Sequence, residues 1–166
     1  MRKSPTPTEF AEKFRDEIRV GFNWKRFLAE KWPIERVVID SKSELYRCFT
    51  PWYIGNVGDQ VAYDDPDSAP MSLADVPKAL EVLSDERKAN ILEKIAKFCE
   101  EPDEIRFTAA TYGLPDGGYF IMDRNHRLSA LTMCEKPFQV ELWNVKGPFE
   151  KECLMDLDFW LRNDET

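Results

Sequence analysis

The chain has 166 residues, of which 31 are acidic and 23 are lysine or arginine, so its formal net charge at pH 7 is −8. That charge argues against non-specific binding of nucleic acid, which requires basic side chains that neutralise phosphates. No apolar run is long enough to cross a membrane, and the N-terminus lacks the apolar stretch of a secretory signal. We therefore expect a cytoplasmic protein without membrane association, and the length favours a single domain over residues 1–166.

The first 33 residues are predicted to form a helical extension. Thr8 is a candidate N-cap for the first helix. Apolar residues then recur every four positions, which is typical of one helix face: Phe10, Phe14 and Ile18. A second short helix is expected between Phe22 and Trp32, because Pro33 cannot continue it.

The next segment predicts one strand, one short helix and a long loop. A strand is expected at 34–40, where three β-branched residues predict burial: Val37, Val38 and Ile39. A short helix is expected at 43–48. Residues 50–71 are rich in proline, glycine and aspartate and predict an irregular loop. Trp52 and Tyr53 most simply pin this loop to the core, with a lid over a site or a partner-binding surface as alternatives.

Two helices are predicted between residues 72 and 102. Ser72 begins a capping-box pattern that opens a helix through about Leu83. Ser84 caps a longer helix, whose first turn carries acids where the helix dipole favours them. The apolar residues of this longer helix are expected on one face: Ile91, Leu92, Ile95, Phe98 and Cys99.

The last third of the chain predicts a hairpin, a helix, a strand and a terminal helix. The turn residues 115–118 separate strands at 104–112 and 119–122. A helix is expected at 125–134 and a half-buried strand at 138–145, where apolar and polar residues alternate. The terminal helix is indicated by the apolar residues Cys153, Leu154, Leu157, Trp160 and Leu161.

The cysteines do not indicate a metal site. The chain has four cysteines in no CxxC pair, and it has one histidine. Zinc sites need closely spaced cysteine and histidine ligands, which this sequence does not offer. Cys99, Cys134 and Cys153 are expected as reduced thiols buried on the apolar sides of helices.

The segment Asp123-Arg124-Asn125-His126-Arg127, called the DRNHR motif below, joins a predicted strand to a predicted helix. The first backbone N–H groups of a helix have no partner within the helix and lie at its positive end. They can receive a phosphate, and His126 and Arg127 are placed to add donors. The motif therefore predicts an anion site.

The order of elements around this motif resembles the ParB/sulfiredoxin superfamily, in which a similar motif opens a helix and contacts nucleotide phosphates. The resemblance covers residues 84–145 well and residues 34–83 loosely. It implies an α/β (α+β) fold, a small mixed sheet flanked by helices, with the core at 34–145 and extra helices at 1–33 and 146–166. Two positions depart from the family pattern. Arg124 stands where the family usually has glycine, and Asn125 stands where sulfiredoxins have their reactive cysteine.

The resemblance implies a nucleotide- or phosphate-binding protein that acts as a phosphotransferase or phosphohydrolase, with ATP or another nucleotide and Mg²⁺. The motif position implies these phosphate-binding residues: Arg124, Asn125, His126 and Arg127. His126 and Asp40 are the candidate catalytic residues, and Asp123 is the candidate metal ligand.

Each motif residue also has a structural interpretation. His126 could hydrogen-bond a neighbouring loop, and Asn125 could cap the helix. Arg127 could form a salt bridge with Asp123 that rigidifies the turn.

A second functional class fits the charge and the aromatic content. The chain could be a non-catalytic immunity or antitoxin-type protein that neutralises a basic partner, such as a bacterial toxin. A nuclease is a third and weaker hypothesis, because an acidic chain approaches DNA unfavourably.

Overall fold

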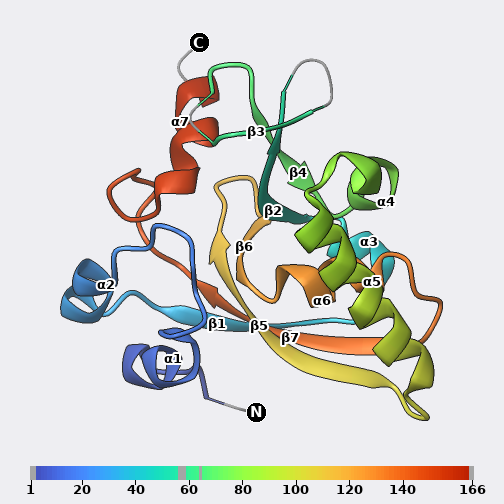
Figure 1. The fold of residues 1–166 in the computed structure, drawn as a ribbon. Helices are drawn as coiled ribbons and strands as arrows, with labels where there is room; N and C mark the ends of the chain where they lie inside the picture. Colours follow the sequence, from blue (N-terminus) through green and yellow to red (C-terminus); the bar gives the residue numbers. More distant parts are fainter. Residues whose placement is uncertain (1–2, 56–58, 64, 165–166) are drawn as a thin grey trace.

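The computed structural model describes residues 3–55, 59–63 and 65–164. Within these residues seven strands form one mixed sheet in the order β1-β7-β5-β6-β2-β3, with β4 paired to β2 (Figure 1). The strands are β1 (Ile34–Ile39), β2 (Cys48–Ile54), β3 (Gln60–Val61), β4 (Ala69–Ser72), β5 (Ile105–Gly113), β6 (Tyr119–Asp123) and β7 (Phe138–Val145). The expected mixed sheet is therefore present, and it is larger than predicted.

Parallel and antiparallel pairs alternate across the sheet. β5 runs parallel to β7, and β6 runs parallel to β2. β1 pairs with β7 and β5 pairs with β6 in antiparallel fashion. The hairpin between β5 and β6 is confirmed, and Gly117 adopts the positive φ of 88° that its turn requires.

Helices cover both faces of the sheet (Figure 1). The helical segments are α1 (Pro7–Phe14), α2 (Trp24–Glu30), α3 (Lys42–Leu45), α4 (Val76–Ala79), η1 (Leu80–Val82), α5 (Asp85–Glu100), α6 (Asn125–Leu131), η2 (Met155–Leu157) and α7 (Asp158–Asp164). One core cluster joins the sheet to α3, α4, α5 and α6. A second cluster joins the other face to α1, α2, η2 and α7, so the N- and C-terminal helices share one face. No helix among the described residues combines the length and the apolar character needed to cross a membrane.

The first helix begins earlier than predicted. Its N-cap is Thr6 rather than Thr8. The Thr6 hydroxyl accepts from the Glu9 backbone N–H, and the Glu9 carboxylate accepts from the Thr6 N–H, each at 3.1 Å. This reciprocal pair satisfies two N–H groups of the first turn. Ile18 lies beyond the helix but is still buried.

The first strand is an edge strand, so the prediction of full burial was wrong. β1 pairs only with β7 among the described strands, and the Val38 side chain is 50% exposed. Ile34 and Ile39, at the two ends of β1, are buried, and the partly buried Val37 packs against the core.

The predicted loop at 50–71 was also wrong, because it contains most of β2, all of β3 and most of β4. β2 lies inside the sheet, although Pro51 lacks the N–H that a central strand uses. The register between β2 and β4 shifts around Pro51. There the Thr50 hydroxyl donates to the Met71 carbonyl at 2.9 Å and accepts from the Trp52 N–H at 3.2 Å. A side chain thus replaces the lost ladder bond at the irregularity.

The helices between 72 and 100 differ from prediction at their edges. Ser72 belongs to β4, and the segment before Ser84 forms only the short α4 and η1. The Ser84 cap of α5 is confirmed, because its hydroxyl accepts from the Arg87 N–H. Leu92 and Cys99 are exposed, contrary to prediction. Each lies one position, about 100° of helix rotation, beyond a residue of the buried stripe.

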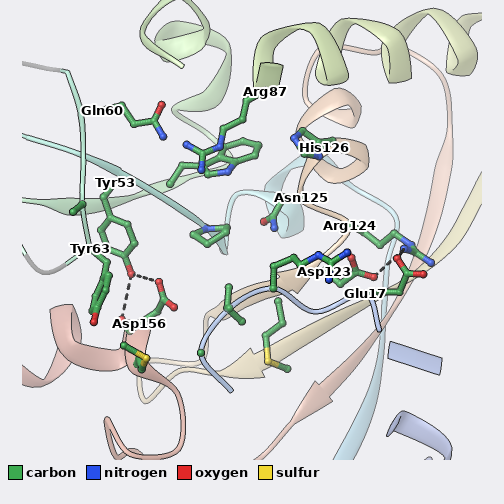
Figure 2. A pocket seen from close by; sticks show the side chains of 18 of the residues that line it. Glu17, Tyr53, Gln60, Tyr63, Arg87, Asp123, Arg124, Asn125, His126 and Asp156 are labelled. Carbon is green, nitrogen blue, oxygen red and sulfur yellow. Dashed lines mark hydrogen bonds and ion pairs between the residues drawn. The ribbon is translucent and has the colours of Figure 1, made fainter. Parts of the chain in front are cut away.

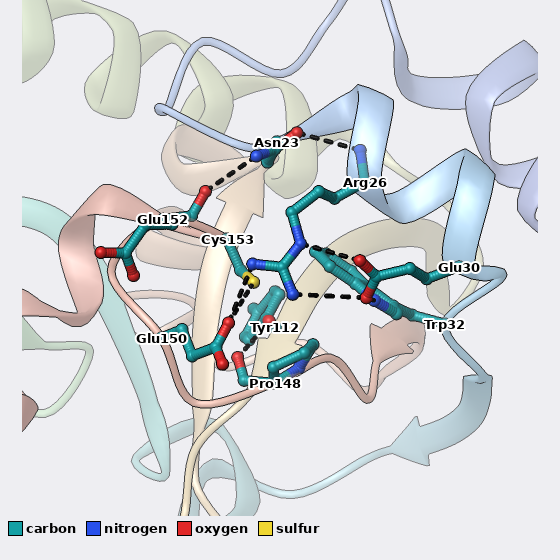
Figure 3. Close-up of polar contacts among 9 residues, drawn as sticks. All are labelled: Asn23, Arg26, Glu30, Trp32, Tyr112, Pro148, Glu150, Glu152 and Cys153. Carbon is teal, nitrogen blue, oxygen red and sulfur yellow. Dashed lines mark hydrogen bonds and ion pairs between the residues drawn. The ribbon is translucent and has the colours of Figure 1, made fainter.

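A polar cluster joins α2 to the segment before η2 (Figure 3). The Asn23 side chain accepts from the Arg26 N–H and donates to the Glu152 carbonyl, both at 3.0 Å. The Arg26 guanidinium pairs with Glu30 and Glu150, each at 2.9 Å. Helix capping and ion pairing therefore fix the N-terminal extension against the C-terminal segment.

Candidate functional site

The DRNHR motif lines an open pocket of about 750 Å³ (Figure 2). β6 ends at Asp123, one residue later than predicted, and α6 begins at Asn125, as predicted. Between them Arg124 is the N-cap residue, with a φ of 75° in the left-handed region. Glycine adopts such a φ without steric cost, whereas a residue with a Cβ atom does not.

The Arg124 side chain is held by acids. Its guanidinium lies 2.9 Å from the Asp123 carboxylate and 3.7 Å from that of Glu17. Burial raises the pKa of Asp123, and the neighbouring Arg124 partly offsets this effect. Asp123 and Arg124 thus neutralise each other at the start of α6.

Asn125 is the first residue of α6, so the prediction that it caps the helix was wrong. Its side chain lines the pocket (Figure 2). The Oδ1 atom is buried and accepts no hydrogen bond from the described residues. A buried acceptor without a partner is costly, and a ligand donor would satisfy it.

His126 is half-buried beside Trp52, with a ring-centroid distance of 5.5 Å. Its Nε2 atom is buried and has no hydrogen-bond partner within the described part of the chain. Burial lowers the pKa of His126, and the positive charges of Arg87 and Lys94 lower it further. The imidazole is therefore neutral near pH 7 and offers hydrogen bonding and basicity rather than positive charge.

Arg127 lines the same pocket and also a neighbouring one of about 800 Å³. The predicted salt bridge between Arg127 and Asp123 is not formed, because Asp123 pairs with Arg124 instead. The Arg127 side chain forms no hydrogen bond or ion pair with the residues that the structure describes. Its donors are available to a ligand.

Three cations of the pocket lining were missed by sequence reasoning: Arg19, Arg87 and Lys94. Arg87 and Lys94 come from α5, and both line the pocket. The Arg87 guanidinium carbon lies 5.6 Å from the centre of the Trp52 ring. The available signal was their spacing of seven residues, which places them on one helix face beside the buried Ile91.

The opposite wall comes largely from the segment 50–71, for which a lid over a site was one alternative, whereas its Asp156 was missed. Tyr53 from β2 donates from its hydroxyl to the Asp156 carboxylate of η2 at 2.7 Å. Burial raises the pKa of both groups. Tyr63 lies 6.4 Å from Tyr53, ring to ring, and Gln60 of β3 lies nearby (Figure 2). The N-terminal segment closes the pocket at Gly21, whose carbonyl accepts from the Met155 N–H.

Asp40 is not brought to the pocket. It follows β1, is exposed, and its backbone N–H donates to the Glu44 carboxylate at 3.3 Å. It therefore does not join His126, the other predicted catalytic residue.

The donor set of the pocket does not suit Mg²⁺. Asp123 is the carboxylate predicted to bind it, and that carboxylate is occupied by Arg124. The described residues contain no group of three or more histidine, cysteine, aspartate or glutamate side chains placed to hold a metal. Magnesium requires oxygen ligands, and nearby guanidinium groups oppose its charge.

No protein-family model, curated protein or solved structure matches the chain. The pocket lining contains five cations, which are Arg19, Arg87, Lys94, Arg124 and Arg127. It contains three acids, which are Glu17, Asp123 and Asp156. An excess of positive charge in a chain of net charge −8 favours an anionic ligand.

Proposed function

We propose that the protein binds a phosphate-bearing small molecule, a nucleotide or another organic phosphate, in the pocket beside the DRNHR motif. One observation carries the proposal: Arg87, Lys94 and Arg127 line the same pocket as the unpartnered polar atoms of Asn125 and His126. Guanidinium groups bind phosphate oxygens through two parallel N–H bonds.

Side chains, rather than the α6 backbone, supply most of the attraction. α6 has seven residues, so its dipole is small. The guanidinium groups of Arg87 and Arg127 have no hydrogen bond or ion pair with other described residues, so a phosphate does not have to displace an acid from them. Arg124 contributes less, because Asp123 and Glu17 already hold its guanidinium.

Phosphotransfer or phosphohydrolysis in this pocket would rely on His126 as the base. A neutral imidazole can take a proton from an attacking water or hydroxyl group. Asp123 is a less suitable base, because its carboxylate already forms an ion pair with the Arg124 guanidinium at 2.9 Å. Release of phosphate from bound nucleotide by the wild type, and its loss in His126→Gln with binding retained, would establish the reaction.

Calorimetry tests the binding step. ATP, ADP, CTP and GTP are titrated with Mg²⁺ and with a chelator, and at least one is expected to bind under both conditions. Arg87→Met and Arg127→Gln each remove charge-assisted hydrogen bonds and are expected to weaken binding about tenfold or more. Lys25→Gln, a charge loss on an exposed face of α2 outside the pocket, is the matched control. Absence of binding by every nucleotide removes nucleotides from the proposal.

Neutralisation of a basic protein partner is the second candidate. The observation that favours it is the net charge of −8, although the pocket lining itself has more cations than acids. Acidic groups are therefore concentrated outside the pocket. Purification of the chain from its host with a stoichiometric basic protein would support this candidate, and purification alone would count against it.

A further inference from the structure

Tyr53 and Asp156 form a hydrogen-bonded pair in the pocket wall. Tyr53 is 3% exposed, and Asp156 is 8% exposed. The Tyr53 hydroxyl lies 2.7 Å from the Asp156 Oδ2 atom and 3.4 Å from its carbonyl. Figure 2 shows this pair, with Tyr63, on the side of the pocket away from Asp123 and Arg124.

The pair offers hydrogen-bond acceptors to the pocket. A carboxylate can accept about four hydrogen bonds, and Tyr53 supplies the one side-chain donor to Asp156 among the described residues. The Tyr53 proton is already used by Asp156, so the phenolic oxygen can only accept. A wall of acceptors repels phosphate and binds groups that donate.

The pocket is too large for phosphate alone. Its volume is about 750 Å³. A water molecule occupies about 30 Å³ of liquid, and a phosphate displaces only a few waters. Pockets of this size are typical of organic ligands, so a phosphate on the cationic side leaves the Tyr53 side for the rest of the ligand.

We infer that the ligand is a sugar phosphate or nucleoside phosphate whose sugar hydroxyls donate to Asp156 and Tyr53 while its phosphate lies among Arg87, Lys94 and Arg127. This inference rests on the proposed function and adds the hydroxyl-bearing group. The shared chemistry is a phosphate joined to a sugar with free hydroxyls, whether the sugar is free or part of a nucleotide.

Calorimetry with matched probes tests the inference. The probes are inorganic pyrophosphate, ribose 5-phosphate, 2-deoxyribose 5-phosphate, ATP and 2′-deoxyATP. The wild type is expected to bind at least one hydroxyl-bearing probe about threefold to tenfold more tightly than its deoxy partner, the effect of one hydrogen bond. Discrimination with both pairs indicates that the sugar phosphate suffices, and discrimination with ATP alone indicates a nucleotide.

Two near-isosteric variants connect the effect to the pair. Tyr53→Phe and Asp156→Asn are each expected to weaken the binding of the hydroxyl-bearing probe about tenfold and to reduce the preference for it over its deoxy partner. The affinity for pyrophosphate is expected to change less than twofold. Tyr46→Phe, an exposed tyrosine outside the pocket, is the control. A cooperative thermal unfolding transition shows that a variant is folded. One folded variant of the two is enough to test the inference.

The outcomes separate the two proposals. Pyrophosphate binding without any preference for the hydroxyl, or with equal losses for all probes in Tyr53→Phe and Asp156→Asn, overturns this inference and leaves the anion site standing. Failure of every phosphate-bearing probe overturns the proposed function and this inference with it.

Discussion

Arg124 holds a backbone conformation that disfavours every residue with a Cβ atom. Its φ is 75°, and its side chain lies between Asp123 and Glu17. Arg124→Gly and Arg124→Ala both remove the guanidinium, but only glycine removes the steric cost of the left-handed region. Glycine loses more entropy on folding, which offsets only part of this steric advantage of about 1–2 kcal/mol. We therefore expect Arg124→Gly to exceed Arg124→Ala in stability by about 0.5–1 kcal/mol. Urea unfolding measures this difference, and a more stable alanine variant would contradict it.

His126 makes stability depend on pH. Its pKa is lowered in the folded chain, whereas an unfolded histidine titrates near about 6.5. Between these two values the unfolded chain binds a proton that the folded chain does not, so the free energy of unfolding falls as pH falls. From about pH 7.5 to about pH 5.5 we expect the wild type to lose more stability than His126→Gln.

Asp123 and Asp156 change the free energy of unfolding with pH in the opposite sense, because burial raises the pKa of each carboxyl. Both remain in the wild type and in His126→Gln, so their effects cancel in the comparison. Urea unfolding at several pH values gives the two curves. Parallel curves would show that the pKa of His126 is not lowered on folding.

Among single residues, the sequence predicted the DRNHR motif but not the side chains that surround it in the fold. The helix start and the unusual arginine were visible, because polar residues followed an apolar strand. The pairing of Asp123 with Arg124 was not, because it depends on a positive φ that local patterns do not reveal. Arg87, Tyr53 and Asp156 come from three distant elements, and only the fold brings them to His126.

Among the elements, α2 and the segment before η2 stabilise each other through Asn23. Its side chain caps α2 and donates to the Glu152 carbonyl. Removal of a helix cap costs about 1–2 kcal/mol, so Asn23→Ala is expected to lower the free energy of unfolding by about that amount. Asn90→Ala is the matched control, because among the described residues that side chain bonds only to the Glu86 carbonyl within α5. Equal effects in urea unfolding would refute the role assigned to Asn23.

Elements with a strong local signal were predicted well from the sequence. The β5–β6 hairpin has its turn residues, α5 has its serine cap, and β7 alternates in burial. β2 was missed because Pro51 and Gly55 are typical of loops. Within β2 the Thr50 hydroxyl donates to the carbonyl of Met71, a residue 21 positions along the chain that local patterns do not connect to it.

For the whole molecule, the distribution of charge matters more than its sum. A net charge of −8 excludes little by itself, because the pocket lining has more cations than acids. The acidic exterior opposes the approach of nucleic acid, while the pocket attracts a small anion. Binding of the proposed ligand should therefore weaken as salt concentration rises, since salt screens these charges.

The central claim is that the pocket beside the DRNHR motif is an anion site. Titration of pyrophosphate into the wild type and into the Arg87→Met/Arg127→Gln double variant tests it most directly. We expect the wild type to bind, and we expect the double variant to lose about a hundredfold or more in affinity, because two charge-assisted contacts are removed. Equal affinities in two folded proteins, or no binding by the wild type, would contradict the claim.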